Sequence, residues 1–232
     1  MKLSRQNSFK RINQLKHIIT KKKNYYSQHG EDVIMCNYFK TRGRNNIFYV
    51  DIGSGDPILH SNTYLLYTKG SRGVCVDANN RLLKKYRFKR KRDITLCYAV
   101  TGRDSSIEDL YVFDMHTVST LEKENVEYLV DNGFKVKRID KVNTININAI
   151  LDIASQIQKI DLLSVDIEGD EITIIKSIDY VKYNPEIICV EVVDFETGMN
   201  LPYSTKIIEF LQHKGYILIA NTDVNLIFAK QQ

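Results

Sequence analysis

The chain has little of what marks a secreted or membrane-spanning protein. No apolar run in its 232 residues approaches the ~20 residues that a spanning helix needs. The N-terminus has no apolar core of the kind found in a signal peptide. The four cysteines are far apart and form no CxxC pair, so neither a disulfide framework nor a zinc site is indicated. Together these absences predict a protein of the reducing cytoplasm.

Proline is also scarce, and the first 30 residues contain no acid. With only three prolines and no linker-like stretch, residues 25–232 are most simply interpreted as one domain.

Before Glu31 the chain has eight Lys or Arg, which predicts a basic extension over residues 1–24. A second basic block lies at residues 81–92. Such blocks are typical of surfaces that bind nucleic acid, anionic lipid or acidic glycans, but equally of solvated tails and helix faces.

The most informative motif is an apolar run that ends in an acid and a Gly-x-Gly turn. Residues 47–52 predict a buried strand that enters the loop of Gly53 and Gly55. Glycines let such a loop bring its backbone close to a ligand. A second apolar run ends at Asp77, where a nucleoside-binding sheet places a carboxylate for ribose hydroxyls. We therefore expect a nucleoside cofactor at the carboxyl edge of a parallel sheet.

The identity of the nucleoside follows from what the glycine motif lacks. Its third glycine is missing, so the dinucleotide fingerprint is incomplete. Asp51, two residues before the first glycine, can accept a hydrogen bond from the ammonium of an amino-acid moiety, which favours S-adenosylmethionine over NAD. Asn62 and Thr63 open a helix whose positive end suits a carboxylate, although simple capping explains them too. The predicted cofactor-binding residues are Asp51, Gly53, Ser54, Gly55, Asn62, Thr63, Asp77 and Ala78.

Strand-like and helix-like segments alternate along most of the chain. Helices between successive strands make the sheet parallel through right-handed crossovers. The last two strands predict an antiparallel hairpin. The segment 101–147 breaks this rhythm and is expected to be an inserted lid or substrate wall. The predicted fold is α/β, with helices on both faces of a mostly parallel seven-stranded sheet. Its expected strands are 47–51, 73–77, 94–98, 160–166, 186–191, 216–220 and 225–229.

Motifs in a fixed order carry a resemblance to a known family. They are residues 26–32 (YSQHGED), 50–57 (VDIGSGDP), 61–67 (SNTYLLY), 70–74 (GSRGV), 77–79 (DAN), 118–120 (VST), 161–170 (DLLSVDIEGD) and 190–191 (VE). Over residues 25–195 the sequence resembles the FkbM family of S-adenosylmethionine-dependent methyltransferases. It departs from many members in having Gly55-Asp56-Pro57 where they have Asn-Asp-Gly, and Ser71 where they have tryptophan. The resemblance implies a Rossmann-like class I methyltransferase fold and O-methylation, mostly of sugar or polyketide hydroxyls.

Methyl transfer to a hydroxyl needs alignment and a group that removes the hydroxyl proton. Acids at the carboxyl ends of parallel strands face the ligand crevice. Asp166 ends a very apolar strand, where burial raises a carboxyl pKa and suits a base. Imidazole also suits neutral pH, and the candidates are His29 in the first motif and His60. Helix capping and loop hydrogen bonds are the simpler interpretations of these residues. The predicted catalytic residues are Asp166, Glu168, His29 and Glu191.

The acids at the strand ends do not by themselves require a divalent metal ion. If Mg²⁺ takes part, Asp166, Glu191 and Asp194 are its expected ligands, because the ion prefers oxygen donors. Nothing in their spacing compels such a site.

The leading hypothesis is a cytoplasmic, S-adenosylmethionine-dependent O-methyltransferase that acts on a hydroxyl of a sugar or glycan precursor. The basic extension would contact an anionic membrane, at its inner face, or an acidic glycan. One alternative is an RNA-directed methyltransferase that uses both basic blocks. Nucleic acid is not expected, because these blocks have little aromatic interleaving for base stacking. The other alternative is a non-catalytic S-adenosylmethionine-binding module, since fold does not fix function.

Overall fold

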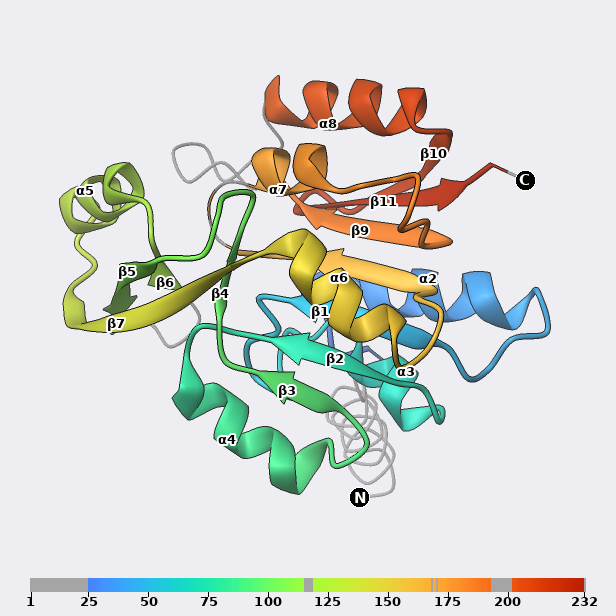
Figure 1. The fold of residues 1–232 in the computed structure, drawn as a ribbon, viewed down its shortest axis with the longest axis horizontal. Helices are drawn as coiled ribbons and strands as arrows, with labels where there is room; N and C mark the ends of the chain where they lie inside the picture. Colours follow the sequence, from blue (N-terminus) through green and yellow to red (C-terminus); the bar gives the residue numbers. More distant parts are fainter. Residues whose placement is uncertain (1–24, 115–118, 168, 170, 193–201, 232) are drawn as a thin grey trace, which may run out of the picture.

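The computed structural model describes residues 25–114, 119–167, 169, 171–192 and 202–231, which form two β-sheets surrounded by helices (Figure 1). The larger sheet has seven strands in the order β10-β11-β9-β8-β1-β2-β3. Five of them are parallel, whereas β11 runs antiparallel to both β9 and β10. The predicted α/β fold, with a mostly parallel sheet and an antiparallel C-terminal hairpin, is confirmed. The strands are β1 (Phe48–Ile52), β2 (Arg72–Val76), β3 (Ile94–Leu96), β8 (Leu162–Val165), β9 (Ile187–Glu191), β10 (Tyr216–Asn221) and β11 (Asn225–Lys230).

Helices cover both faces of the larger sheet, because its strands bury side chains on both sides. Successive side chains of a strand point to opposite faces. Val50 and Leu163 therefore join the core beneath α6, α7 and α8, whereas Tyr49 and Leu162 join the core beneath α2, α3 and α4. These helices are α2 (Glu31–Lys40), α3 (Tyr64–Thr68), α4 (Asn80–Lys89), α6 (Ile147–Ser155), α7 (Glu171–Ser177) and α8 (Pro202–His213).

The segment that breaks the sequence rhythm forms the second sheet, with strand order β4-β7-β5-β6. β5 and β7 pair antiparallel, and β4 pairs parallel with the end of β7. Figure 1 shows this sheet and α5 to one side of the larger sheet. The elements are β4 (Ala99–Thr101), β5 (Ile107–Phe113), β6 (Ser119–Thr120), α5 (Lys123–Asp131) and β7 (Val136–Asn146).

The second basic block is not a uniform solvated face, because Arg90 is fully buried. Its Nε donates to Asp93 at 2.6 Å. One terminal nitrogen donates to the Tyr49 hydroxyl at 2.9 Å and to Thr63 Oγ1 at 2.8 Å, and the other donates to Ser61 Oγ at 3.2 Å. A buried charge is tolerated only when it is paired and hydrogen-bonded in this way.

The hydrogen bonds of Arg90 continue into the two central strands. The Tyr49 hydroxyl donates to Asp93 at 2.7 Å, and the Gly73 amide donates to the same carboxylate at 2.9 Å. Thr63 Oγ1 donates to Asp51, the residue two positions before the glycine turn. The guanidinium thus joins the end of α4, the start of α3, β1 and β2. We call Arg90, Asp93, Tyr49, Ser61, Thr63 and Asp51 the Arg90 network.

Replacing Arg90 with methionine tests whether this network holds the fold together. Removing one partner of a buried pair leaves the other charge uncompensated, so we expect the free energy of unfolding to fall by about 3–5 kcal/mol in R90M. Urea unfolding followed by circular dichroism measures this change.

Exposed Lys84, on the same helix, provides the matched control. K84M should change the free energy of unfolding by no more than about 0.5 kcal/mol. R90K should not restore stability, because an ammonium cannot reproduce the planar set of guanidinium donors. Equal stability of R90M and K84M would contradict the structural role of the network.

Candidate functional site

A cavity of about 840 Å³ opens at the carboxyl ends of the central parallel strands. Its walls include the glycine turn after β1, the residues that follow β2 and β8, and the inner side of the second sheet. In open α/β sheets this is where ligands bind, at the point where the strand order reverses around β1. The volume lies in the range of small-molecule and cofactor sites.

The glycine turn is fixed by close contact with the end of β8. Gly53 and Gly55 have φ angles of 72° and 56°, in the left-handed region that favours glycine. A Cβ on Gly53 would lie 1.5 Å from the Asp166 carbonyl oxygen, which leaves no room for any side chain. The amides of Gly53 and Ser54 both donate to the Val76 carbonyl, at 2.9 and 3.0 Å. The turn is therefore held against two neighbouring strands.

Ser54 combines a place in the cavity wall with a buried hydroxyl that has no hydrogen-bond partner. Its side chain is buried and lines the cavity wall. Across the described residues, Ser54 Oγ is the single buried side-chain nitrogen or oxygen without a hydrogen-bond partner. Because buried polar groups in native proteins nearly always have partners, this hydroxyl indicates a bound polar group.

Asp77 is oriented by the turn that it faces. One carboxylate oxygen accepts from the Gly55 amide at 2.9 Å, and the other accepts from the Asn79 amide at 2.6 Å. Burial raises the pKa of Asp77 to about 6, against the lowering effect of these hydrogen bonds. Each oxygen retains a lone pair for a ligand hydroxyl. Ala78 follows in the same wall.

The other predicted cofactor residues lie behind this wall. Asp51 is buried in the Arg90 network, and burial raises its pKa to about 6, although Arg90 and the Thr63 hydrogen bond lower it. The Asn62 amide donates to Ser164 Oγ at 3.3 Å within the sheet. Asp51, Asn62 and Thr63 thus support the turn, whereas Gly53, Ser54, Gly55, Asp77 and Ala78 line the cavity.

Two of the predicted catalytic acids come together in the cavity. Asp166 follows β8 and Glu191 ends the neighbouring β9, and their side chains are hydrogen-bonded to each other. Burial raises the pKa of Asp166, and the hydrogen bond from Glu191 acts against this rise. The two carboxyl side chains therefore lie within hydrogen-bonding reach of each other in the wall of the cavity.

The remaining acidic candidates lie outside the described residues. These are Glu168 and Asp194. In the parts of the chain that the structure describes, no group of three or more His, Cys, Asp or Glu is arranged to hold a metal ion.

The two candidate histidines differ in position. His29 is exposed and does not line the cavity, and its amide donates to Glu31 Oε2 at 2.9 Å. Its motif builds a turn in which the Ser27 hydroxyl donates to buried Asp32 at 2.8 Å. His60 lines the cavity with a φ of 57°, and its charge lowers the pKa of Asp166. His60 is therefore the one of the two candidate histidines that lines the cavity.

Sequence reasoning missed Glu171, at the start of α7. Its Oε1 accepts from the amides of Ile167 and Gly169, at 3.2 and 3.1 Å. Burial raises its pKa to about 7, against the lowering effect of the backbone hydrogen bonds. Glu171 thereby fixes the loop that follows Asp166. An acid in the first turn of a helix is a recognisable signal, but it suggests capping alone.

The second sheet and α4 form the opposite wall of the cavity. β5 contributes an apolar surface of Leu110, Val112 and Phe113. Arg138 links the two elements, because its guanidinium donates to Asn79 Oδ1 at 3.3 Å. This wall is also rich in cations, which are Arg81, Lys85, Arg103, Lys137 and Arg138.

Comparison with known proteins agrees with this arrangement. The family model described as "Methyltransferase FkbM domain" matches residues 51–218. The matched range contains the glycine turn, Asp77, the Asp166–Glu191 pair and the second sheet. A search of curated proteins finds no match to the chain.

The contact between Gly53 and Asp166 can be tested by adding one carbon atom. G53A should be less stable than G55A by about 1–3 kcal/mol, the usual cost of overpacking. Both substitutions place alanine at a positive φ, but a Cβ on Gly55 meets nothing closer than 3.8 Å. Urea unfolding of the two variants isolates the contribution of the contact. Equal stabilities would show that the turn and the β8 end are not in contact.

Proposed function

Because the chain belongs to the FkbM methyltransferase family, we propose that it is an S-adenosylmethionine-dependent O-methyltransferase. We propose a hydroxyl of a sugar or glycan precursor as its acceptor. The observation that carries the proposal is that Ser54, in the wall of the cavity beside Asp77, has a buried hydroxyl without a hydrogen-bond partner.

The residues at this end of the cavity suit S-adenosylmethionine. Asp77 offers two carboxylate oxygens to ribose hydroxyls. The lack of a Cβ at Gly55, where no protein atom would lie closer than 3.8 Å, lets the backbone approach the ligand. Ser54 Oγ gains the partner that it lacks in the protein alone. When bound, S-adenosylmethionine supplies an electrophilic methyl group on a sulfonium.

The Asp166–Glu191 pair supplies the base. An acceptor hydroxyl must lose its proton for transfer, and a partly desolvated carboxylate with a raised pKa suits that role. In the proposal Asp166 takes the proton, and Glu191 holds Asp166 in position through their hydrogen bond. His60 balances the negative charge of the pair from the cavity wall.

The wall formed by α4 and the second sheet suits an acceptor that carries phosphate. Arg81 and Lys137 line it without an ion pair among the described residues. Phosphate on a nucleotide-linked or lipid-linked sugar would complement these cations, while β5 offers the sugar an apolar surface.

Cellular location is part of the same proposal. Among the described helices, none is long and apolar enough to cross a membrane. All four cysteines are free, which suits the reducing cytoplasm. We place the enzyme there, with its basic extension at the inner face of an anionic membrane or on an acidic glycan.

Cofactor binding can be measured by titration calorimetry with S-adenosylhomocysteine. D77N should bind about 10- to 100-fold more weakly than the wild type, the usual cost of losing hydrogen bonds to a charged group. The affinity of the wild type for S-adenosylhomocysteine should rise between about pH 5 and about pH 7. Asp77 accepts hydrogen bonds from the ribose hydroxyls as a carboxylate, and its pKa is about 6. D77N should lose this rise.

Asp109 on β5 provides the control for D77N, since it pairs with Lys141 and does not line the cavity. D109N should bind S-adenosylhomocysteine as the wild type does. If D77N matched D109N in affinity and pH dependence, the ribose would not lie on Asp77.

The base can be tested by transfer of labelled methyl groups to a set of nucleoside-diphosphate sugars. D166N should lower kcat by about 10²- to 10⁴-fold, while S-adenosylhomocysteine affinity stays at the wild-type value. E191Q should have a smaller effect, because an amide still donates a hydrogen bond to Asp166. Full kcat in D166N would exclude Asp166 as the base.

A further inference from the structure

The structure divides the second basic block into three groups of side chains. Arg90 is buried in its network. Arg92 donates to the Tyr67 carbonyl and stacks on the Tyr67 ring, with its guanidinium carbon 3.9 Å from the centroid. The rest of the block is exposed, and of it Lys85 pairs with Asp56 at 2.8 Å. Lys84, Arg87 and Lys89 are exposed and form no ion pair with any described residue.

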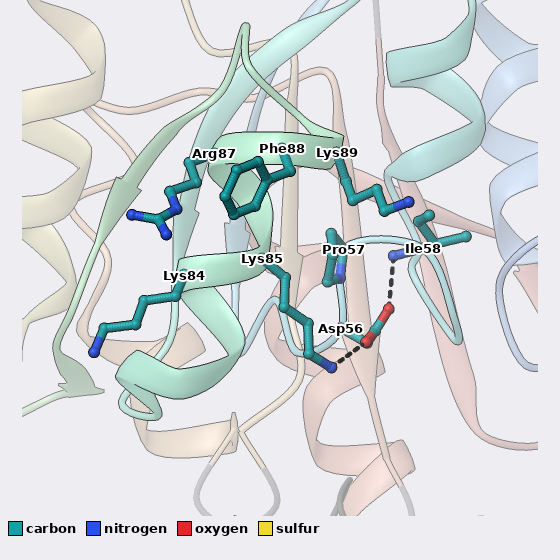
Figure 2. Close-up of a pocket in the computed structure, with 8 residues that line it drawn as sticks. All are labelled: Asp56, Pro57, Ile58, Lys84, Lys85, Arg87, Phe88 and Lys89. Carbon is teal, nitrogen blue, oxygen red and sulfur yellow. Dashed lines mark hydrogen bonds and ion pairs between the residues drawn. The ribbon is translucent and has the colours of Figure 1, made fainter.

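These three cations surround a hollow of about 360 Å³ between α4 and the loop after the glycine turn. Figure 2 shows Lys84, Lys85, Arg87, Phe88 and Lys89 of α4 on one side and Pro57 and Ile58 of the loop on the other. Phe88 is 65% exposed, and the Arg87 guanidinium lies 4.5 Å from its ring centroid. Leu59, beside this loop, is 68% exposed. One large apolar side chain, that of Phe88, is therefore exposed among unpaired cations.

The charge of this face is almost entirely positive. The chain has no acid between Asp77 and Asp93. Asp56 lines the hollow, but it is neutralised by Lys85. We propose that this face of α4 docks on the surface of an anionic lipid bilayer. Lys84, Arg87 and Lys89 bind lipid phosphates, and Phe88 inserts among the headgroups, where aromatic side chains are favoured.

The same face fits nucleic acid less well. Single-stranded nucleic acid is bound by several aromatic rings along a basic groove, whereas Phe88 is the one aromatic residue that lines the hollow. An exposed phenylalanine among exposed cations is better suited to the interfacial region of a bilayer.

Docking here would place the large cavity beside the membrane. Asp56 and Lys85 line both the hollow and the cavity. An acceptor anchored in the bilayer could then reach the cavity directly. This inference goes beyond the proposed methyl transfer, and vesicle binding by the α4 face does not depend on it.

Co-sedimentation of the full chain with lipid vesicles tests the proposal. The wild type should bind vesicles of phosphatidylglycerol and phosphatidylcholine more tightly than phosphatidylcholine alone, and salt should weaken this binding. K84Q/R87Q/K89Q should bind about fivefold more weakly for each cation removed, or on the order of a hundredfold in total. F88S should bind about tenfold more weakly.

Matched controls remove equal charge or apolar surface elsewhere. K40Q/K159Q/K176Q loses three exposed lysines outside α4, and V181S loses an exposed valine. Both should bind vesicles as the wild type does. Urea unfolding shows that the variants keep their fold, and calorimetry with S-adenosylhomocysteine is measured separately, so failure of membrane docking is separable from failure of the proposed function.

Three results would overturn the proposal. The first is equal binding of the wild type to anionic and to neutral vesicles. The α4 triple variant could bind vesicles no more weakly than its control, which would place the membrane contact elsewhere on the chain. Finally, α4-dependent binding to RNA or DNA oligonucleotides without binding to vesicles would identify this face as a nucleic-acid surface.

Discussion

The ligand-binding end of the molecule depends on the buried guanidinium of Arg90. Its four hydrogen bonds to Asp93, Tyr49, Ser61 and Thr63 join segments that are far apart in the sequence. Through Thr63 the network reaches Asp51 and thus the strand that leads into the glycine turn. A buried charged side chain is stable only when it is paired and all of its hydrogen-bonding groups have partners. The position of the turn is therefore set by a network that lies behind the cavity.

A second contact links the cofactor end of the cavity to its acidic pair. The backbone of Gly53 lies against the backbone carbonyl of Asp166, with no space for a Cβ between them. The same residues thus place both the turn proposed to face the cofactor and the carboxyl proposed as the base. Methyl transfer needs its reacting atoms aligned to within a fraction of an ångström. A direct backbone contact, rather than a flexible side chain, is well suited to hold that alignment.

Much of the fold could be predicted from the sequence, because its signals are local. Apolar runs that end in acids mark the central parallel strands, and Gly53, Gly55 and Asp77 follow such runs. The hairpin at the C-terminus was equally clear from its two apolar runs around residues 221–223. The acidic pair followed from the rule that strand ends meet at one edge of a parallel sheet.

The remaining features depend on contacts that no local pattern reveals. Arg90 belongs to a run of exposed cations, and only its distant partners Tyr49 and Ser61 make its burial possible. Asp51 has the sequence position of a ligand-binding acid, but Thr63 and the network occupy its carboxylate. His29 and His60 both lie in loops beside motifs, and their exposure to the cavity depends on loop geometry. Tertiary contacts therefore decide which polar residues face the ligand.

The central claim is that the glycine turn, Ser54 and Asp77 together form a site for S-adenosylmethionine. A crystal structure of the chain with S-adenosylhomocysteine tests it most directly. The account predicts ribose hydroxyls on the Asp77 carboxylate and a hydrogen bond between the ligand and Ser54 Oγ. A ligand bound elsewhere, or Ser54 Oγ still without a partner beside a bound ligand, would contradict it.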